Sequence, residues 1–319
     1  MLAETLPSEV LRASTRIERF IRRTPLDYSP RFSNDTGVNV YLKLENLQFT
    51  GSFKARGAYN KLLSLTDDQR SAGCVVASSG NHGAATAHAM QKLGVHGIVF
   101  VPEQTSPTKV GAIRESGTEV RFFGTDGLDT EVHAREYAGQ NGMRYISPYN
   151  DADVIAGQGT CGVEIAAALP SLDAVFIAVG GGGLISGAGA FLKSVNPGIS
   201  IVACQPQASA VMTRSVQAGR ILELPGEPTL SDGTAGGIEA GALTFDLCRK
   251  IADDYVLVSE QEIAQAMRTF MDAHHMLPEG AAGVALAGLV RKASAFENRN
   301  VAVIICGGNV SRDTLKTVI

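Results

Sequence analysis

The chain has 319 residues, of which 19% are charged and 45% hydrophobic, and its formal net charge is −4. That length suffices for about two domains with sizeable cores, and the composition excludes disordered, collagen-like and coiled-coil proteins. The slightly acidic balance provides no positive field for a phosphate backbone, so we expect no nucleic-acid partner.

The first thirty residues mix acidic and basic side chains with apolar ones, so they lack the apolar core of a secretion signal. The five cysteines are scattered singly without a C-x-x-C pair, which favours a reducing compartment over a disulfide framework. One uncharged run, residues 174–192, is long enough to span a membrane, but it contains four consecutive glycines. A strand, a glycine turn and a helix explain it better. We therefore expect a cytoplasmic protein without a membrane partner.

Lys54 lies in residues 50–57, TGSFKARG, a segment rich in turn formers. A lysine that is partly shielded from water loses its proton more readily, and the neutral amine can form an imine with an aldehyde. The simpler interpretation is a solvated surface lysine. The neighbouring glycine, serine and phenylalanine favour the shielded one.

From residue 73 onward, short β-branched runs alternate with longer alanine-rich runs of helical periodicity. The expected strands are residues 74–78, 96–101, 119–123, 174–179, 199–205, 255–259 and 301–306. The expected helices are residues 81–93, 107–116, 126–141, 184–194, 260–274 and 279–292, with one more after Ser209. Such alternation predicts parallel sheets covered by helices on both faces, which is an α/β fold.

An irregular stretch around residues 145–159, which contains a proline and two glycines, separates two series of these units. It predicts two α/β domains with a cleft between them. Ligands of such folds lie beyond the carboxyl ends of the strands, where glycine turns lead into helices. Three glycine turns occupy such places, after Ser78, Val179 and Cys306.

A run of four glycines follows the strand expected at residues 174–179, namely Gly180, Gly181, Gly182 and Gly183. Successive N–H groups of such a turn, together with the following helix terminus, can bind a phosphate; the alternative is a tight structural turn. No Gly-Lys dipeptide occurs and residues 180–187 do not fit G-x-G-x-x-G, so the common nucleotide-binding loops are excluded. With Lys54, a small phosphorylated ligand indicates the aldehyde cofactor pyridoxal 5'-phosphate (PLP).

Several segments together resemble the fold-type II PLP-dependent enzymes of the threonine/serine dehydratase and serine racemase family. They occur in family order at residues 43–47 (KLENL), 50–57, 78–83 (SSGNHG), 155–160 (IAGQGT), 180–183 and 306–309 (CGGN). The resemblance implies a two-domain α/β fold like that of the tryptophan synthase β chain, with parallel sheets flanked by helices and the cofactor in the interdomain cleft. Residues 1–47 and 151–319 would form the large cofactor-binding domain, and residues 48–150 the small α/β domain.

The same resemblance implies roles for residues around the cofactor. Lys54 would carry the cofactor covalently and later remove the substrate α-proton, and Phe53 would lie against the pyridine ring. Asn81 would donate to the cofactor's phenolic oxygen. The phosphate would rest on the N–H groups of Gly180, Gly181, Gly182, Gly183 and Leu184.

The substrate's α-carboxylate would be held by the loop that precedes the helix at residues 81–93. Its members are Ser79, Gly80, Asn81 and His82. His82 is equally well explained as a structural part of that loop. In racemases of the family, a serine at the position of Ser79 acts as acid or base on the ring face opposite the lysine.

Cys306 matches a position that faces the pyridine nitrogen in the family. A neutral thiol cannot keep that nitrogen protonated as an aspartate does, so the ring becomes a weaker electron sink and loss of a β-leaving group is favoured. The simpler interpretation is a buried structural cysteine. Glu279 matches a position near the ring, but it is equally well explained as an acid stabilised by a helix dipole.

The implied activity is that of an ammonia-lyase of the EC 4.3.1 class, which converts L-threonine or L-serine to a 2-oxo acid and ammonia. Ser79 leaves an amino-acid racemase open as the alternative. A more specialised substrate, such as 3-hydroxyaspartate, phenylserine or a compound of hydroxyectoine breakdown, also stays open. The third class is a non-catalytic protein that binds a phosphorylated ligand.

Serine racemases carry a divalent-metal site after a strand, but the matching residues 203–211 contain no carboxylate, so we expect no metal. The family implies a homodimer that binds a small amino-acid substrate. Because no residue follows Ile319, we expect neither a C-terminal regulatory domain nor control by isoleucine.

Overall fold

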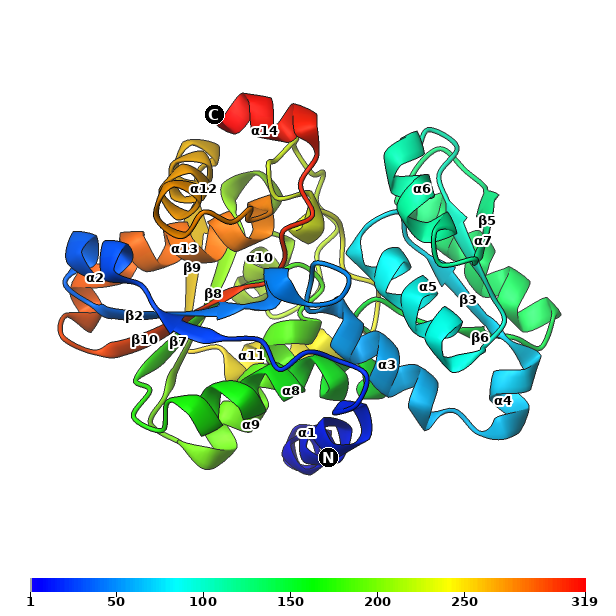
Figure 1. Ribbon diagram of the computed structural model, residues 1–319, viewed down its shortest axis with the longest axis horizontal. Helices are drawn as coiled ribbons and strands as arrows, with labels where there is room; N and C mark the ends of the chain where they lie inside the picture. Colours follow the sequence, from blue (N-terminus) through cyan, green and yellow to red (C-terminus); the bar gives the residue numbers. More distant parts are fainter. Residues whose placement is uncertain (1) are drawn as a thin grey trace.

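The computed structural model of the chain describes residues 2–319, and its strands form two separate sheets (Figure 1). The larger sheet consists, in spatial order, of β1 (Leu26–Tyr28), β2 (Asn39–Leu44), β10 (Asn300–Ile305), β7 (Ala174–Ala178), β8 (Ser200–Pro206) and β9 (Asp254–Val258). The smaller sheet consists of β5 (Glu119–Phe122), β4 (Gly97–Val101), β3 (Cys74–Ala77) and β6 (Arg144–Tyr145).

Neighbouring strands of both sheets run parallel, with one exception. The short edge strand β1 pairs antiparallel with β2. An edge position needs no crossover connection, so a reversed strand fits there. The predicted α/β fold with parallel sheets is confirmed.

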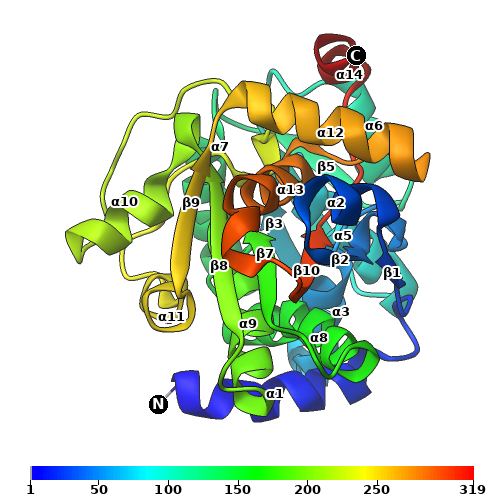
Figure 2. The same ribbon diagram turned by 90° about the vertical axis from the view of Figure 1, so that its left-hand side faces the viewer.

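Helices cover both faces of the larger sheet. Figure 2 shows three of them above it, α2 (Pro30–Thr36), α12 (Glu260–His274) and α13 (Gly280–Lys292). Below it lie α1 (Leu2–Ile17), α8 (Ala152–Ala168) and α9 (Gly183–Val195). The remaining helices of this part are α10 (Val211–Ala218), α11 (Leu243–Ile251) and α14 (Arg312–Val318). Because every residue of β7 is buried between these layers, the strand is a continuous apolar run.

Around the smaller sheet lie α3 (Lys54–Ser64), α4 (Asp67–Ala72), α5 (Asn81–Leu93), α6 (Pro107–Arg114) and α7 (Gly127–Gln140). Cys74 and Val76 of β3 belong to one buried cluster with α3 and α5, whereas Val75 belongs to another with α7. This alternation places helices on opposite faces of the sheet. The strands of this sheet fall inside the small domain that we predict for residues 48–150, whose boundaries stay a prediction.

The elements expected after residue 73 occur in the expected order. The expected helices at residues 81–93 and 260–274 are α5 and α12. The uncharged run of residues 174–192 is divided between β7, a glycine loop and α9. Within residues 2–319, no helix has both the length and the apolar character that a membrane crossing requires.

One boundary was predicted wrongly. The stretch of residues 145–159 is not irregular throughout, because α8 begins at Ala152. Its two glycines lie inside that helix, where a Cβ at Gly157 would stand 2.6 Å from the Cα of Gly57. A Cβ at Gly159 would likewise stand 3.0 Å from the backbone of α9. Both glycines therefore permit close packing of helices and do not form a turn.

Candidate active site

Lys54 is the first residue of α3 and is only partly exposed. Just before it, the Phe53 N–H donates to the carbonyl oxygen of Cys306 at 3.0 Å, which fixes the start of the helix against the end of β10. The Lys54 amine donates to the carbonyl oxygen of Pro148 at 2.8 Å. Burial lowers the pKa of Lys54 to about 8, although the charge of the nearby Glu279 acts to raise it.

The ring of Phe53 lies beside this amine, with Nζ of Lys54 at 5.2 Å from the ring centroid. An aromatic face at that distance attracts a positively charged amine. It also covers one side of the amine with apolar surface.

Four side chains from three distant segments form one hydrogen-bonded chain. Asn309 donates to Oδ1 of Asn81 at 2.8 Å, and Nδ2 of Asn81 donates to Glu279 at 2.8 Å. The Cys306 thiol donates to the other carboxylate oxygen of Glu279 at 3.5 Å. The start of α5, the end of β10 and the N-cap of α13 therefore meet near Lys54.

Burial governs the protonation of the two acids in this chain. Glu279 is 4% exposed, and burial raises its pKa to about 7, although hydrogen bonds from Asn81 and Cys306 oppose the rise. Burial also raises the pKa of the Cys306 thiol well above its ordinary value, and the charge of Glu279 raises it further. Cys306 is therefore neutral throughout the physiological pH range.

The four glycines connect β7 to α9. Gly182 has a φ of +85°, a left-handed conformation that favours glycine. A Cβ at Gly181 would overlap the ring of Tyr149, and one at Gly180 would stand 3.0 Å from the Cα of Thr234. Close neighbours therefore require glycine at these positions, which agrees with the interpretation as a tight structural turn.

The backbone N–H groups of the same turn are available to a ligand. Within residues 2–319, the N–H groups of residues 180–183 donate to no other group. Free donors at a helix N-terminus suit an anion.

A second helix N-terminus has free donors at α5. Gly80 is the N-cap residue and supplies no side chain, and the N–H groups of Asn81 and His82 have no acceptor within the described part of the chain. The Gly80 N–H donates to the hydroxyl of Ser78 at 3.2 Å. Ser79 is partly exposed, and its hydroxyl makes no hydrogen bond among residues 2–319. This terminus also suits a carboxylate.

His82 points into the protein. Its Nε2 donates to the carbonyl oxygen of Ile146 at 2.9 Å, because a carbonyl can only accept. Burial and then the charge of Lys54 lower the pKa of His82 to about 3, so the imidazole is neutral. The structural interpretation of His82 accounts for these contacts.

Two residues that contribute to the site were not predicted from the sequence. The carbonyl oxygen of Pro148 cannot be recognised from the residue type, since every residue carries one. Tyr149, which packs on Gly181, lies in the stretch that we interpreted as irregular. The side chain of Asn309 had a signal in the segment CGGN, but its contact with Asn81 depends on the fold.

The arrangement has the chemistry to hold an aldehyde that carries a phosphate. An amine that loses its proton near pH 8 can form an imine, and the free N–H groups of the glycine turn can bind the phosphate. The thiol of Cys306 and the amide of Asn81 both donate to Glu279. Among residues 2–319, no group of three or more His, Cys, Asp or Glu side chains is arranged to bind a metal ion.

The chain matches a known family and is similar to several known proteins and solved structures. Residues 17–307 match the family described as pyridoxal-phosphate dependent enzyme. The chain is 37% identical over 311 residues to an L-threonine ammonia-lyase of Thermotoga maritima, covering 98% of this chain and 77% of that protein. Maize serine racemase matches the fold with a TM-score of 0.92 and 31% identity, over 97% of this chain and 95% of that one. The processed threonine deaminase isoform 2 of Solanum lycopersicum matches with a TM-score of 0.92 and 34% identity, over 98% and 92%.

Proposed function

The chain belongs to the pyridoxal-phosphate dependent enzymes, and from this membership we propose that it dehydrates and deaminates a β-hydroxy amino acid such as L-threonine or L-serine. Water is lost at the β-carbon and a water molecule later replaces the amine, so the net products are a 2-oxo acid and ammonia. The observation that carries the proposal is the partly buried Lys54 amine beside the neutral thiol of Cys306. The similarity to an L-threonine ammonia-lyase over 98% of the chain supports it.

When bound, pyridoxal phosphate supplies an electron sink that makes the α-hydrogen of an amino acid acidic. Lys54 is the residue that binds its aldehyde and removes the α-proton. An ordinary lysine is almost fully protonated at neutral pH, whereas a group with a pKa of about 8 releases and regains a proton readily. The carbonyl oxygen of Pro148 keeps the amine at one place between these steps.

Backbone donors would hold the two anionic ends of the ligands. The N–H groups of Gly180, Gly181, Gly182, Gly183 and Leu184 would bind the phosphate at the start of α9. The loop Ser79, Gly80, Asn81 and His82 would bind the substrate carboxylate at the start of α5. Asn81 would orient the cofactor through its amide, and Phe53 would cover the ring.

Cys306 bears on the choice of reaction. Because burial keeps its thiol protonated, it presents no negative charge to a ring nitrogen. Without an anionic partner a ring nitrogen would not stay protonated, and the ring would then be a weaker electron sink. Prompt departure of a β-hydroxyl would therefore be the favoured outcome. Dehydration therefore fits the site better than reactions that require a long-lived carbanion.

The proposal is tested by incubating the purified enzyme with L-threonine and with L-serine, and measuring both the 2-oxo acid and the D-amino acid. We expect mainly 2-oxo acid. Lys54→Ala should abolish the product and the visible absorption of the lysine-bound cofactor. Lys92→Ala, an exposed lysine on α5, serves as the control and should change neither. An excess of D-amino acid over 2-oxo acid would contradict the proposal.

Racemisation is the second candidate, and the free hydroxyl of Ser79 favours it. The fold similarity to maize serine racemase supports it further. If Ser79 supplies a proton on the face opposite Lys54, Ser79→Ala should abolish formation of the D-enantiomer and retain part of the dehydration. Equal loss of both activities would refute that role.

The assembly and location of the enzyme are part of the proposal. We infer a homodimer in the cytoplasm, and the five buried, unpaired cysteines are consistent with a reducing compartment. Sedimentation velocity of the purified holoenzyme should give a single species of twice the chain mass. A monomer at micromolar concentration would rule the dimer out. Comparing 3-hydroxyaspartate, phenylserine and hydroxyectoine-derived substrates with threonine tests the specialised alternatives.

A further inference from the structure

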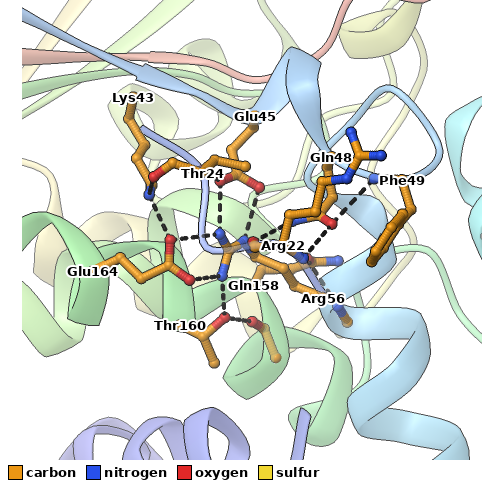
Figure 3. A network of polar contacts seen from close by, with 12 residues as sticks. Arg22, Thr24, Lys43, Glu45, Gln48, Phe49, Arg56, Gln158, Thr160 and Glu164 are labelled. Carbon is orange, nitrogen blue, oxygen red and sulfur yellow. Dashed lines mark hydrogen bonds and ion pairs between the residues drawn. The ribbon is translucent and has the colours of Figure 1, made fainter. Parts of the chain in front are cut away.

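A buried ion network includes Arg56, the third residue of α3 (Figure 3). Its members are Thr24, Lys43, Glu45, Arg56, Thr160 and Glu164. The side chains of Lys43, Glu45 and Arg56 are at most 1% exposed, and that of Glu164 is 12% exposed. The proposed reaction uses none of these groups.

Arg56 uses every N–H group of its guanidinium. Nε and one Nη2 hydrogen donate to the two oxygens of Glu45 at 2.8 and 2.7 Å. Nη1 and the other Nη2 hydrogen donate to the two oxygens of Glu164 at 2.7 and 2.9 Å. The last Nη1 hydrogen reaches the hydroxyl of Thr160 at 3.0 Å. Only arginine has five donors in a rigid plane, so a lysine could keep the charge of Arg56 but not this geometry.

The charges of the network balance. Lys43 donates to Glu164 at 2.5 Å and to the carbonyl oxygen of Thr24 at 2.6 Å, while the Thr24 hydroxyl donates to Glu45. Burial acts to raise the pKa of Glu45, but Arg56 and Lys43 lower it overall, so both carboxylates face a cation. Two basic and two acidic side chains therefore face one another, so their formal charges add up to zero.

Well-packed apolar side chains can replace a buried ion network with no loss of stability, because the ions must give up their water. Apolar contacts, however, do not fix the orientation of the groups that they bring together. The five hydrogen bonds of the Arg56 guanidinium form a fork that connects α3 at once to η1 (Glu45–Leu47) and to α8. Nearby, the Gly57 N–H donates to the side chain of Gln158 at 3.1 Å and adds a second link to α8.

Lys54 lies in the sequence between Arg56 and two residues that are hydrogen-bonded to the end of β10. On its N-terminal side, Ser52 forms a β-bridge with Gly307 and Phe53 donates to Cys306. On its C-terminal side, Arg56 fixes the same helical turn two residues later. The backbone of Lys54 is therefore held at both ends, and its side chain starts from a fixed place.

We propose that Arg56 is a positioning residue for Lys54. The hydrogen bonds of Arg56 fix the first turn of α3 and so direct the Lys54 amine to its place at the carbonyl oxygen of Pro148. The proposal rests on the role proposed for Lys54. It predicts that loosening the fork moves the amine toward water even where the charge at position 56 is kept. A general loss of stability elsewhere in α3 would not do so.

The test is the variant Arg56→Lys, studied as the full chain. In the holoenzyme we expect kcat to fall about tenfold or more while KM changes less than about threefold, since a misplaced base affects the chemical step. In the chain freed of cofactor, the pH dependence of acetylation at Lys54, followed by peptide mass spectrometry, reports the amine directly. Its midpoint should rise by about half a pH unit or more toward the ordinary lysine value.

The matched control is Leu62→Ala, which removes a buried side chain from the other end of the same helix. It should lower the melting temperature and leave the Lys54 midpoint unchanged. If Arg56→Lys lowers the melting temperature in the same way and leaves both the midpoint and kcat unchanged, the role of Arg56 is merely structural and the proposal is wrong.

Should Arg56→Lys fail to fold, Thr160→Val removes one acceptor of the fork and takes its place. A smaller rise of the midpoint supports the proposal, and an unchanged midpoint and kcat overturn it. Because acetylation needs neither substrate nor cofactor, it separates this inference from the proposed reaction. A wrong substrate would leave the midpoint shift intact.

Discussion

At Glu279 a carboxyl group that is 4% exposed receives hydrogen bonds from Asn81, Cys306 and the backbone of Asn309, but burial outweighs them. Burial therefore raises its pKa from 4.5 to about 7. The folded chain holds this proton more tightly than the unfolded chain. The resulting stabilisation is fully present below pH 4.5 and is lost as the pH rises through about 7.

Glu279→Gln should remove this pH dependence, because an amide does not titrate. Between pH 5 and pH 8, the cofactor-free wild type should lose about 2 kcal/mol of unfolding free energy relative to the variant. Urea unfolding at the two pH values measures the difference. If both proteins followed the same pH profile, Glu279 would not carry a raised pKa.

At the scale of elements, helices α8 and α9 approach so closely that side chains are excluded between them. A Cβ at Gly187 of α9 would overlap the carbonyl oxygen of Ile155 in α8, and one at Gly162 would stand 2.8 Å from the carbonyl oxygen of Ala188. These contacts hold in place the helix whose N-terminus adjoins the glycine turn. Helix α9 therefore takes part both in this close packing and in the proposed phosphate site.

Gly187→Ala should lower the free energy of unfolding by at least about 2 kcal/mol, because the backbone must move apart to admit the methyl group. Gly111→Ala in α6 is the matched control, since nothing lies within 4 Å of its Cβ position. It should be stabilising by up to about 1 kcal/mol through helix propensity and reduced freedom of the unfolded chain. Chemical unfolding compares the two, and a change of the same sign in both would refute this account.

Across the whole molecule, two ion pairs connect helices of the smaller sheet to residues 231–241 beside the larger one. Arg135 of α7 reaches Glu239 at 2.7 Å, while its guanidinium lies 4.3 Å from the centroid of the Tyr145 ring. Lys109 of α6 reaches Asp232 at 3.3 Å, but the carboxylate of this pair is 67% exposed, against 26% for that of Glu239. The pair of Arg135 and Glu239 is less exposed and is therefore screened less by solvent. We expect this pair to contribute more to the link between α7 and residues 231–241.

Glu239→Gln should therefore accelerate hydrogen exchange in residues 231–241 and in α7. Asp232→Asn provides the comparison, and its exchange should match that of the wild type because exposed pairs contribute little. Hydrogen exchange with mass spectrometry resolves both segments. Equal protection in Glu239→Gln and the wild type would show that the Arg135 pair does not link them.

The sequence alone predicted the α/β class and the order of the elements after residue 73. These follow from local chemistry, since apolar periodicity identifies strands and helices. The role of Lys54 stays a prediction. The four glycines after β7 likewise could be recognised as a turn. The start of α8 could not, because glycines that serve helix packing look the same in a sequence as glycines that form a loop.

Only the tertiary structure determined which groups meet. Asn81, Glu279 and Asn309 lie far apart in the chain, and nothing local places them in one hydrogen-bonded row. The same holds for the fork of Arg56, whose carboxylate partners lie 11 and 108 residues away. Electrostatic energies and pKa values depend on distance and burial, and both of these arise only when the two sheets and their helices are packed together.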